Sequence, residues 1–167
     1  FNSSYIQTPD SDSLSFGDGT NDSPFSISAW IKTTNVFGKG IVSKWGNNPK
    51  GYEWIFWGDN NKISLVLYSG GTSSYNFVKR IGNTSINSGK WTHVLATYDG
   101  RGGDGTTGNS ANQGIKIYIN GVEESSYTDS SPTNQIYGAM VNTTRPVQIG
   151  AYSSIPFGGE ISNVAIF

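Results

Sequence analysis

Apolar and polar residues alternate along most of this chain, so that every second side chain would fall on one face of an extended strand. In residues 25–32 (FSISAWIK) the apolar positions begin at Phe25 and recur at every second residue, whereas Trp30 falls among the polar ones. Residues 62–68 (KISLVLY) and 114–121 (GIKIYING) repeat the pattern. Further strands are predicted in GIVSKW (40–45), YEWIFW (52–57), YNFVKRI (75–81), WTHVLATY (91–98), PVQIGAY (146–152) and GEISNVAIF (159–167).

The connections between these segments indicate antiparallel strands. Asn120 and Gly121 readily adopt the positive φ angles of a two-residue hairpin turn, so we expect residues 122–127 to return antiparallel to the strand before them. No segment of helical length carries an apolar stripe, and only residues 134–141 would allow a helical turn. The Gly-rich stretch 99–114 is predicted to be a long loop. The pattern therefore predicts two antiparallel sheets around one core.

Composition narrows the class of protein. The chain has 167 residues, which suits one domain with a sizeable core, and only 14% of them are charged. Solubility must come from Ser, Thr, Asn and Gly, a composition that fits secreted β-proteins and particle-surface proteins. A net charge of −1 without a basic cluster predicts no nucleic-acid partner and no anionic membrane partner. No apolar run is long enough to span a bilayer. The absence of cysteine excludes disulfides and thiolate sites, and leaves the compartment open.

The ordered set of segments resembles a known family. The chain carries FSISAWIK, IVSKWG, WTHVLATYDG, IKIYINGV, PVQIGAY and FGGEISNVAIF in that order. This set is similar to the laminin G-like (LamG) modules of the concanavalin A-like lectin/glucanase superfamily, as found in bacterial secreted and phage proteins. The resemblance implies an all-β fold, a jelly-roll antiparallel β-sandwich that forms a single domain over residues 1–167. It also implies that Trp30 and Trp91 lie in the core. Because FNSSYIQTPD does not look like a natural start, we expect the segment to be part of a larger protein.

Catalysis is the first function to test. Retaining glucanases of this superfamily carry their carboxylates on one strand, spaced E-x-D-x-E or E-x-D-x-x-E, and this chain has no such strand. Glu53 has no carboxylate two or four residues on, and adjacent Glu123 and Glu124 would point to opposite faces. His93 is the only histidine, and we expect it to be packed beside Trp91 rather than to act as a base. The sequence predicts that the domain is not an enzyme.

A calcium site is the second possibility. The loop GDGTND offers the oxygen ligands Asp18, Asn21 and Asp22 directly before a core strand. The alternative is that these residues only form a turn through hydrogen bonds to their own backbone. The related pentraxins bind calcium in the loop after the strand matching PVQIG, but here that loop (AYSSIPFGG) has no carboxylate before Glu160. We therefore expect at most one structural Ca²⁺ ion, held by the Asp18–Asp22 loop. With one His and no Cys, zinc is not expected.

Sugar binding is the third possibility. Carbohydrate sites combine aromatic faces with planar polar side chains, and 13% of this chain is aromatic. The densest patch is GYEWIFWGDNN (51–61), where Tyr52, Trp54 and Phe56 would share one strand face and Trp57 would lie on the other. Aromatic residues at strand ends beside polar loops are the better candidates. The predicted ligand-binding residues are Trp45, Trp57, Asp59 and Tyr152.

The sequence is compatible with two functions. The first is a non-catalytic, lectin-like module that binds a glycan or cell-surface polysaccharide as part of an extracellular or virion-surface protein. The second is a structural role without a small ligand, as a phage capsid decoration or tail-fibre domain that associates with itself or is anchored to a virion or larger protein.

Overall fold

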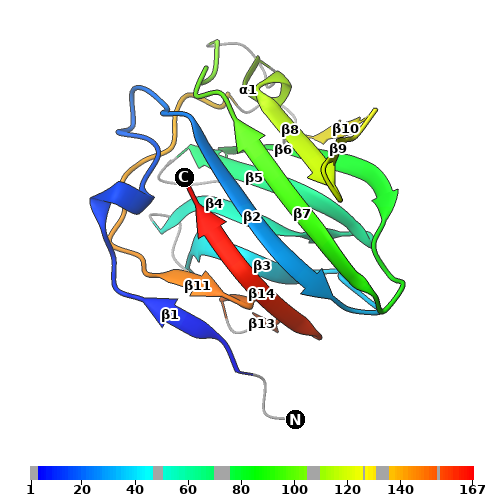
Figure 1. The fold of residues 1–167 in the computed structure, drawn as a ribbon. Helices are drawn as coiled ribbons and strands as arrows, with labels where there is room; N and C mark the ends of the chain where they lie inside the picture. The colour runs from blue at the N-terminus through cyan, green and yellow to red at the C-terminus, as the bar shows by residue number, and fades with distance from the viewer. Residues whose placement is uncertain are drawn as a thin grey trace.

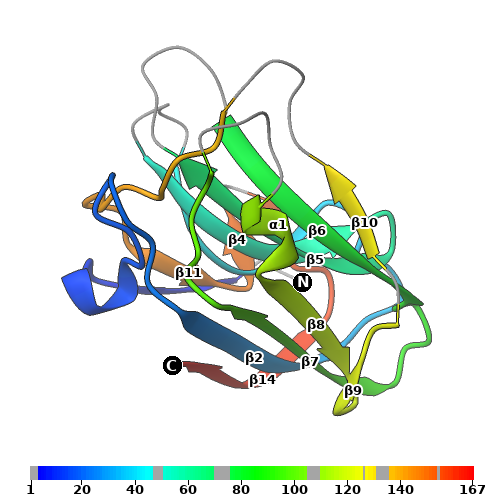
Figure 2. The same ribbon diagram turned by 90° about the horizontal axis from the view of Figure 1, so that it is seen from above.

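The computed structural model of the chain describes residues 4–46, 51–69, 76–104, 110–125, 127–130, 136–153 and 155–167. Two antiparallel sheets lie face to face (Figures 1 and 2). The first has seven strands in the order β1 (Ile6–Thr8), β11 (Val147–Ile149), β3 (Lys39–Trp45), β4 (Tyr52–Asp59), β5 (Lys62–Ser69), β6 (Asn76–Ser85) and β10 (Tyr127–Ser130). The second has five, in the order β14 (Glu160–Ile166), β2 (Phe25–Lys32), β7 (Trp91–Tyr98), β8 (Ile115–Ile119) and β9 (Val122–Glu123). A hairpin of β12 (Ala151–Tyr152) and β13 (Ile155–Pro156) forms a third, small sheet. The predicted β-sandwich is confirmed.

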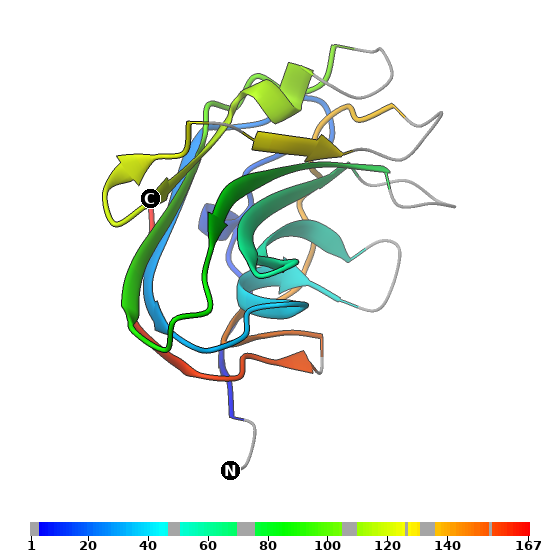
Figure 3. The ribbon, with the colours of Figure 1, turned by 90° about the vertical axis from the view of Figure 1, so that its right-hand side faces the viewer.

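The core fills the space between the two large sheets, whose strands curve around it (Figure 3). Its inward-facing side chains include Ile27 and Ile31 of β2, Leu65 and Leu67 of β5, and Ile117 of β8, all fully buried. They occupy the alternate positions that the sequence predicts. Burial of each such side chain contributes about 1.5–3 kcal/mol relative to its exposure to water, so this alternation is the main source of the fold's stability.

Trp30 and Trp91 are not in the core, and the expectation taken from the family is wrong for both. They are 40% and 43% exposed on the outer face of the five-stranded sheet. The alternation of each strand decides this: Ile31 and Thr92 are buried, so their neighbours Trp30 and Trp91 point outward.

The hairpin after β8 is shorter than predicted. Asn120 and Gly121 have φ angles of 51° and 81°, as the predicted turn requires. However, only Val122–Glu123 pair with β8, and the chain then crosses to the other sheet, where β10 pairs with β6. The buried carboxylate of Glu124 explains the crossing, because it accepts hydrogen bonds from Thr84 N at 2.7 Å and Thr84 Oγ1 at 2.6 Å.

The short helical elements lie where none was predicted. The described part of the predicted turn, residues 136–141, is not helical, and residues 134–135 lie outside the described ranges. Instead, a 3-10 turn (η1) covers Asp12–Leu14, and the helix α1 covers Ser110–Gln113 within the predicted loop. Within the described residues, no helix is long and apolar enough to cross a membrane.

Candidate functional site

Six aromatic rings form a row outside the core, on the outer face of the seven-stranded sheet. We call this the aromatic row: Trp57, Tyr152, Trp45, Tyr52, Tyr68 and Phe77. Along it, ring centroids are 5.5 Å apart for Trp57 and Tyr152, 5.4 Å for Tyr152 and Trp45, and 4.8 Å for Trp45 and Tyr52. The row continues from Tyr52 to Tyr68 at 5.4 Å and from Tyr68 to Phe77 at 5.9 Å. None of these residues belongs to the buried core cluster, and all except Tyr52 are partly exposed.

Strand periodicity turns most of the row outward. On β5 the core takes Leu65 and Leu67, which leaves Tyr68 on the outer face. On β4 the core takes Trp54 and Phe56, which leaves Trp57 on the outer face. Each strand thus presents apolar surface to both sides, although only one side meets the other large sheet.

Tyr52 joins the row because of a β-bulge. Lys44 pairs with Trp54, and Trp45 pairs with Tyr52, so Glu53 has no partner on β3. A bulge reverses which face the following positions occupy, and the ring of Tyr52 stacks on that of Trp45 at an interplanar angle of 22°. The prediction that Tyr52 shares a face with Trp54 and Phe56 is therefore wrong.

Tyr152 reaches the row because Gly40 has no side chain. A Cβ atom at Gly40 would lie 2.6 Å from the backbone carbon of Ala151 and 2.6 Å from the backbone nitrogen of Tyr152. The missing Cβ lets β12 cross closely over β3. The hydroxyl of Ser43 holds this position by donating a hydrogen bond of 2.9 Å to the carbonyl oxygen of Ala151. Burial of the phenol raises the pKa of Tyr152.

Asp59 forms an ion pair with Lys79. The Nζ atom of Lys79 lies 2.6 Å from Oδ2 of Asp59, and both side chains are mostly buried. Lys79 pairs with Val66, and Val66 pairs with Ile55 of β4. These residues lie on the outer face, next to the pair of Trp57 and Ser64. The structure thus places all four predicted ligand-binding residues on this face, with three of them in direct ring contact. That they bind a ligand stays a prediction. Sequence reasoning did not single out Tyr68 and Phe77, although the alternation in KISLVLY and YNFVKRI contained the signal.

The outer face also carries hydrogen-bonding atoms that no other described residue satisfies. They are Nε1 of Trp45, Nε1 of Trp57, Oγ of Ser64 and Oε1 of Gln148. Ser64 pairs directly with Trp57, and Gln148 pairs with Ser43. These atoms are themselves buried, and an unpaired buried polar group costs about 1–3 kcal/mol.

The predicted calcium ligand Asp22 is already surrounded by hydrogen-bond donors. Its Oδ2 accepts hydrogen bonds from the hydroxyls of Tyr98 at 2.8 Å and Tyr137 at 2.7 Å, and its Oδ1 accepts one from Met140 N at 2.7 Å. Burial raises the pKa of the Asp22 carboxyl, although these three hydrogen bonds act in the opposite direction. A cation at Asp22 would have to displace donors from both carboxylate oxygens.

Asp18 and Asn21 form a turn instead of a ligand cage. The Oδ1 atom of Asp18 accepts hydrogen bonds from Thr20 N and Asn21 N, both at 2.7 Å. These bonds, that from Asn21 first, lower the pKa of the Asp18 carboxyl. Among the described residues, no three His, Asp or Glu side chains gather closely enough to hold a metal. The described residues therefore form the hydrogen bonds of the turn-forming alternative, and a Ca²⁺ ion at Asp18, Asn21 and Asp22 stays a prediction. Calcium binding has no support from this geometry.

Two carboxylates do converge elsewhere, but on a buried ammonium group. The Nζ atom of Lys44 lies 2.9 Å from Oδ1 of Asp10 and 2.9 Å from Oε1 of Glu53, and the side chains of Lys44 and Glu53 are completely buried. Oε1 of Glu53 also accepts hydrogen bonds from Thr143 N and Thr143 Oγ1. This network fastens the N-terminal segment and residue 143 to β3 and β4. Neither carboxylate lines a described cavity, so the arrangement fits a structural role.

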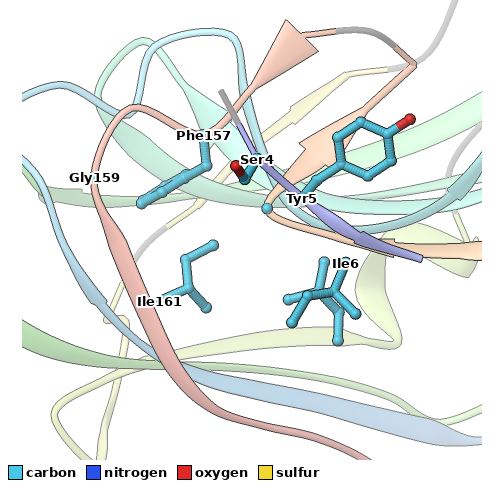
Figure 4. A pocket seen from close by; sticks show the side chains of 8 residues that line it. Ser4, Tyr5, Ile6, Phe157, Gly159 and Ile161 are labelled. Carbon is cyan, nitrogen blue, oxygen red and sulfur yellow. The ribbon is translucent and has the colours of Figure 1, made fainter. Parts of the chain in front are cut away.

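Two hollows lie outside the aromatic row. One, of about 210 Å³, opens between the edge strands β1 and β14 and is lined mainly by Tyr5, Ile6, Phe157 and Ile161 (Figure 4). The other, of about 330 Å³, lies against Trp30 and Trp91. His93 lies beside it, with its ring centroid 5.4 Å from that of Trp30. Neither hollow contains a predicted site residue.

Comparisons with known proteins agree with this architecture. A family model described as the concanavalin A-like lectin/glucanases superfamily matches residues 2–167. No curated protein matches the sequence significantly.

Solved structures show the same fold at low sequence identity. The binding domain of Paraclostridial Mosquitocidal Protein 1 has a TM-score of 0.58 and 14% identity, over 99% of this chain and 37% of that one. Domains LG4-5 of the mouse laminin alpha1 chain have a TM-score of 0.56 and 13% identity, over 98% and 39%. Botulinum neurotoxin type C, described as depending upon interaction with two ganglioside molecules to get into cells, has a TM-score of 0.56 and 18% identity, over 98% and 36%. The chain thus spans little more than a third of these structures.

Proposed function

Because the chain belongs to the concanavalin A-like lectin/glucanase superfamily, we propose that it is a non-catalytic, lectin-like module that binds a glycan or cell-surface polysaccharide on the aromatic row. The observation that carries the proposal is the contact of Trp57 and Trp45 with Tyr152 between them. Three partly exposed rings from separate parts of the chain meet on the face of the sheet that points away from the core.

The chemistry of this face suits a sugar. The C–H face of a pyranose packs on aromatic rings, and the rings of Trp45, Trp57 and Tyr152 are partly exposed on this face. Covering about 150 Å² of ring surface would contribute roughly 4 kcal/mol at about 25 cal/mol/Å², which is no more than the lost translational and rotational freedom costs on association, about 4 kcal/mol or more. One sugar ring would therefore bind weakly, and a polymer or clustered glycan would bind much more tightly through several contacts.

The solved structures with this fold offer an analogy for the function. The botulinum neurotoxin structure is that of a toxin that interacts with gangliosides, and at 18% identity its likeness to this chain shows the fold alone. The binding domain of the mosquitocidal protein is likewise a binding module on this fold. We propose by this analogy that the chain acts in a secreted or surface-exposed protein.

A glycan array tests the proposal. The chain, displayed in several copies to gain avidity, should bind a defined subset of glycans, and Trp57→Ala and Tyr152→Ala should each remove that binding. Tyr118→Ala is the matched control, because Tyr118 is an aromatic residue of the other sheet, and it should leave binding intact. A blank array would reject the proposal in favour of a structural role as a capsid decoration or fibre domain. Equal loss in Tyr118→Ala would reject the aromatic row as the site.

A further inference from the structure

A second aromatic site lies on the opposite side of the sandwich. Trp30, Trp91, Ser162 and Asn163 line the hollow of about 330 Å³, which we call the tryptophan groove. They belong to β2, β7 and β14, which are neighbouring strands of the five-stranded sheet (Figure 1). The groove lies on the outer face of this sheet. Both tryptophans are more exposed than any ring of the aromatic row.

The strand register brings the two indoles together. Trp30 pairs with His93, and Lys32 pairs with Trp91, so Trp30 and Trp91 are diagonal neighbours on adjacent strands. Diagonal neighbours lie about 7–8 Å apart, within reach of aromatic side chains. Ser162 pairs with Trp30 from the other side, so the hydroxyl of Ser162 lies next to the indole of Trp30.

A β-bulge in β14 presents Asn163 at this groove. Ser162 pairs with Trp30, and Ala165 pairs with Ser28, so two residues of β14 face a single residue of β2. Asn163 has a φ angle of 50°, in the left-handed region that asparagine adopts more readily than most residues with a side chain. Bulges of this kind redirect side chains and occur often beside functional sites. The bulge therefore brings Asn163 to the groove, and the planar amide of Asn163 suits hydrogen bonds to hydroxyl groups.

The charges beside the groove favour a neutral ligand. Lys32 and Glu160 form an ion pair of 2.8 Å across β2 and β14, so that each charge compensates the other. Among the described residues, no carboxylate, ammonium or guanidinium group lines the groove itself. The imidazole of His93, which pairs with Trp30, is the titratable group beside it.

The exposed surface is too small for a stable protein interface. A tryptophan that is about two-fifths exposed presents roughly 100 Å², so the pair presents about 200 Å², against about 800 Å² per partner in a typical interface. Serine residues of β2, Ser26 and Ser28, continue the outer face on one side, so the apolar surface does not extend along that strand. A sugar ring is close to the size that two such indoles can cover.

We propose that the tryptophan groove is a second carbohydrate site, which holds one neutral pyranose ring against the indoles of Trp30 and Trp91. The side chains of Asn163 and Ser162 form hydrogen bonds with the hydroxyl groups of this sugar. The inference goes beyond the aromatic row, because it concerns the other sheet and other residues. Two sites on opposite faces of the sandwich would let one module connect two glycan chains.

Fluorine NMR of the chain labelled with 5-fluorotryptophan tests the groove separately from the aromatic row. The five tryptophans give five signals, which single Trp→Phe variants assign. Lactose, maltotriose and cellotriose serve as probes up to millimolar concentrations. The signals of Trp30 and Trp91 should shift together and saturably with at least one probe, whether or not those of Trp45 and Trp57 move. If none of the probes shifts the signals of Trp30 and Trp91, the proposal is overturned.

Asn163→Gly provides a variant that keeps the fold, because glycine adopts a positive φ without strain. It should weaken the response of Trp30 and Trp91 at least several-fold. Asn60→Gly is the matched control, since Asn60 has a φ angle of 51° outside the groove, and it should have no effect. An unchanged response in Asn163→Gly would overturn the assignment of the amide. Signals of Trp30 and Trp91 that shift with protein concentration alone would show that a second copy of the chain occupies the groove, and this too would overturn the proposal.

Discussion

The hydroxyl of Tyr137 donates a hydrogen bond of 2.7 Å to the carboxylate of Asp22, which precedes it by 115 residues. Together with Tyr98 and Met140 N, Tyr137 gives the buried carboxylate three donors. The loop before β2 is thereby fastened to β7 and to residues 137–140. A sequence pattern that resembles a metal site serves here to hold distant segments of the sandwich together.

Asp22→Ala should strongly destabilise the domain. The substitution leaves two phenol hydroxyls and one backbone N–H without an acceptor, and each such loss costs about 1–3 kcal/mol. We expect the free energy of unfolding, measured in urea, to fall by at least about 3 kcal/mol. Asp18→Ala is the control, because Asp18 is exposed and its carboxylate bonds, among the described residues, within its own turn, and its effect should be much smaller. Equal losses in the two variants would contradict the role assigned to Asp22.

The free energy of unfolding should depend on pH through the titration of the Asp22 carboxyl. Because burial raises its pKa in the folded state, the folded protein binds this proton more tightly than the unfolded chain does. Stability should therefore fall as pH rises from about 3.9, the unfolded value, through the higher folded value. Asp22→Asn removes the titrating group, so the stability of the natural chain minus that of Asp22→Asn should decrease across this window. A difference that increases with pH would mean that the folded pKa is lowered instead.

The thermal melt should not respond to EDTA. Both oxygens of Asp22 and Oδ1 of Asp18 already accept hydrogen bonds from the protein, so removal of calcium should leave the melting temperature unchanged. The measurement is a melt with EDTA against one with added CaCl₂. A melting temperature that EDTA lowers in the natural chain, but not in Asp22→Ala, would restore the calcium prediction.

The buried Lys44–Glu53 pair should show strong coupling. Lys44→Met leaves a buried carboxylate unpaired and should cost about 3–5 kcal/mol. In the double variant with Glu53→Gln, the neutral amide still accepts from Thr143, so the loss should be clearly smaller than the sum of the two single losses. A double-mutant cycle in urea measures this difference. Additive losses would show that the two side chains act independently.

Gly40→Ala should weaken glycan binding although it replaces no aromatic residue. The new Cβ would lie 2.6 Å from the backbone of Ala151 and Tyr152, which forces β12 and the ring of Tyr152 away from Trp45 and Trp57. A loss of about 1.4 kcal/mol in binding corresponds to a tenfold weaker Kd, and we expect at least that for an array ligand well below the melting temperature. Gly138→Ala is the matched control, since, its two chain neighbours apart, no atom of the described residues lies within 4 Å of its added Cβ. Unaltered binding by Gly40→Ala would separate Tyr152 from the site.

Period-two reasoning predicted the strands well, because the faces of a strand follow directly from the alternation. The segments 25–32 and 91–98 coincide with β2 and β7. The error at Trp30 came from following family position against the alternation, which had already placed Trp30 among polar residues. The error at Tyr52 has another cause: the bulge at Glu53 depends on how β4 pairs with β3, which the sequence of one strand does not reveal.

The candidate site was only partly predictable. Trp45, Trp57 and Tyr152 stood out as aromatic residues at strand ends, but their contact depends on the close approach of β12 to Gly40, more than a hundred positions away in the chain. The role of Asp22 was hidden for the same reason. An Asp in a Gly-rich loop suits a turn, a metal or a buried hydrogen-bond acceptor equally, and only the positions of Tyr98 and Tyr137 decide among them.

The most direct test of binding on the aromatic row is a two-dimensional ¹H–¹⁵N NMR titration that follows the indole N–H signals of the tryptophans, with the strongest array ligand. The signals of Trp45 and Trp57, whose rings are partly exposed on this face, should shift and saturate together as the ligand covers the indoles. If these two signals stay fixed while the ligand is bound, the glycan lies elsewhere and the proposed site is wrong.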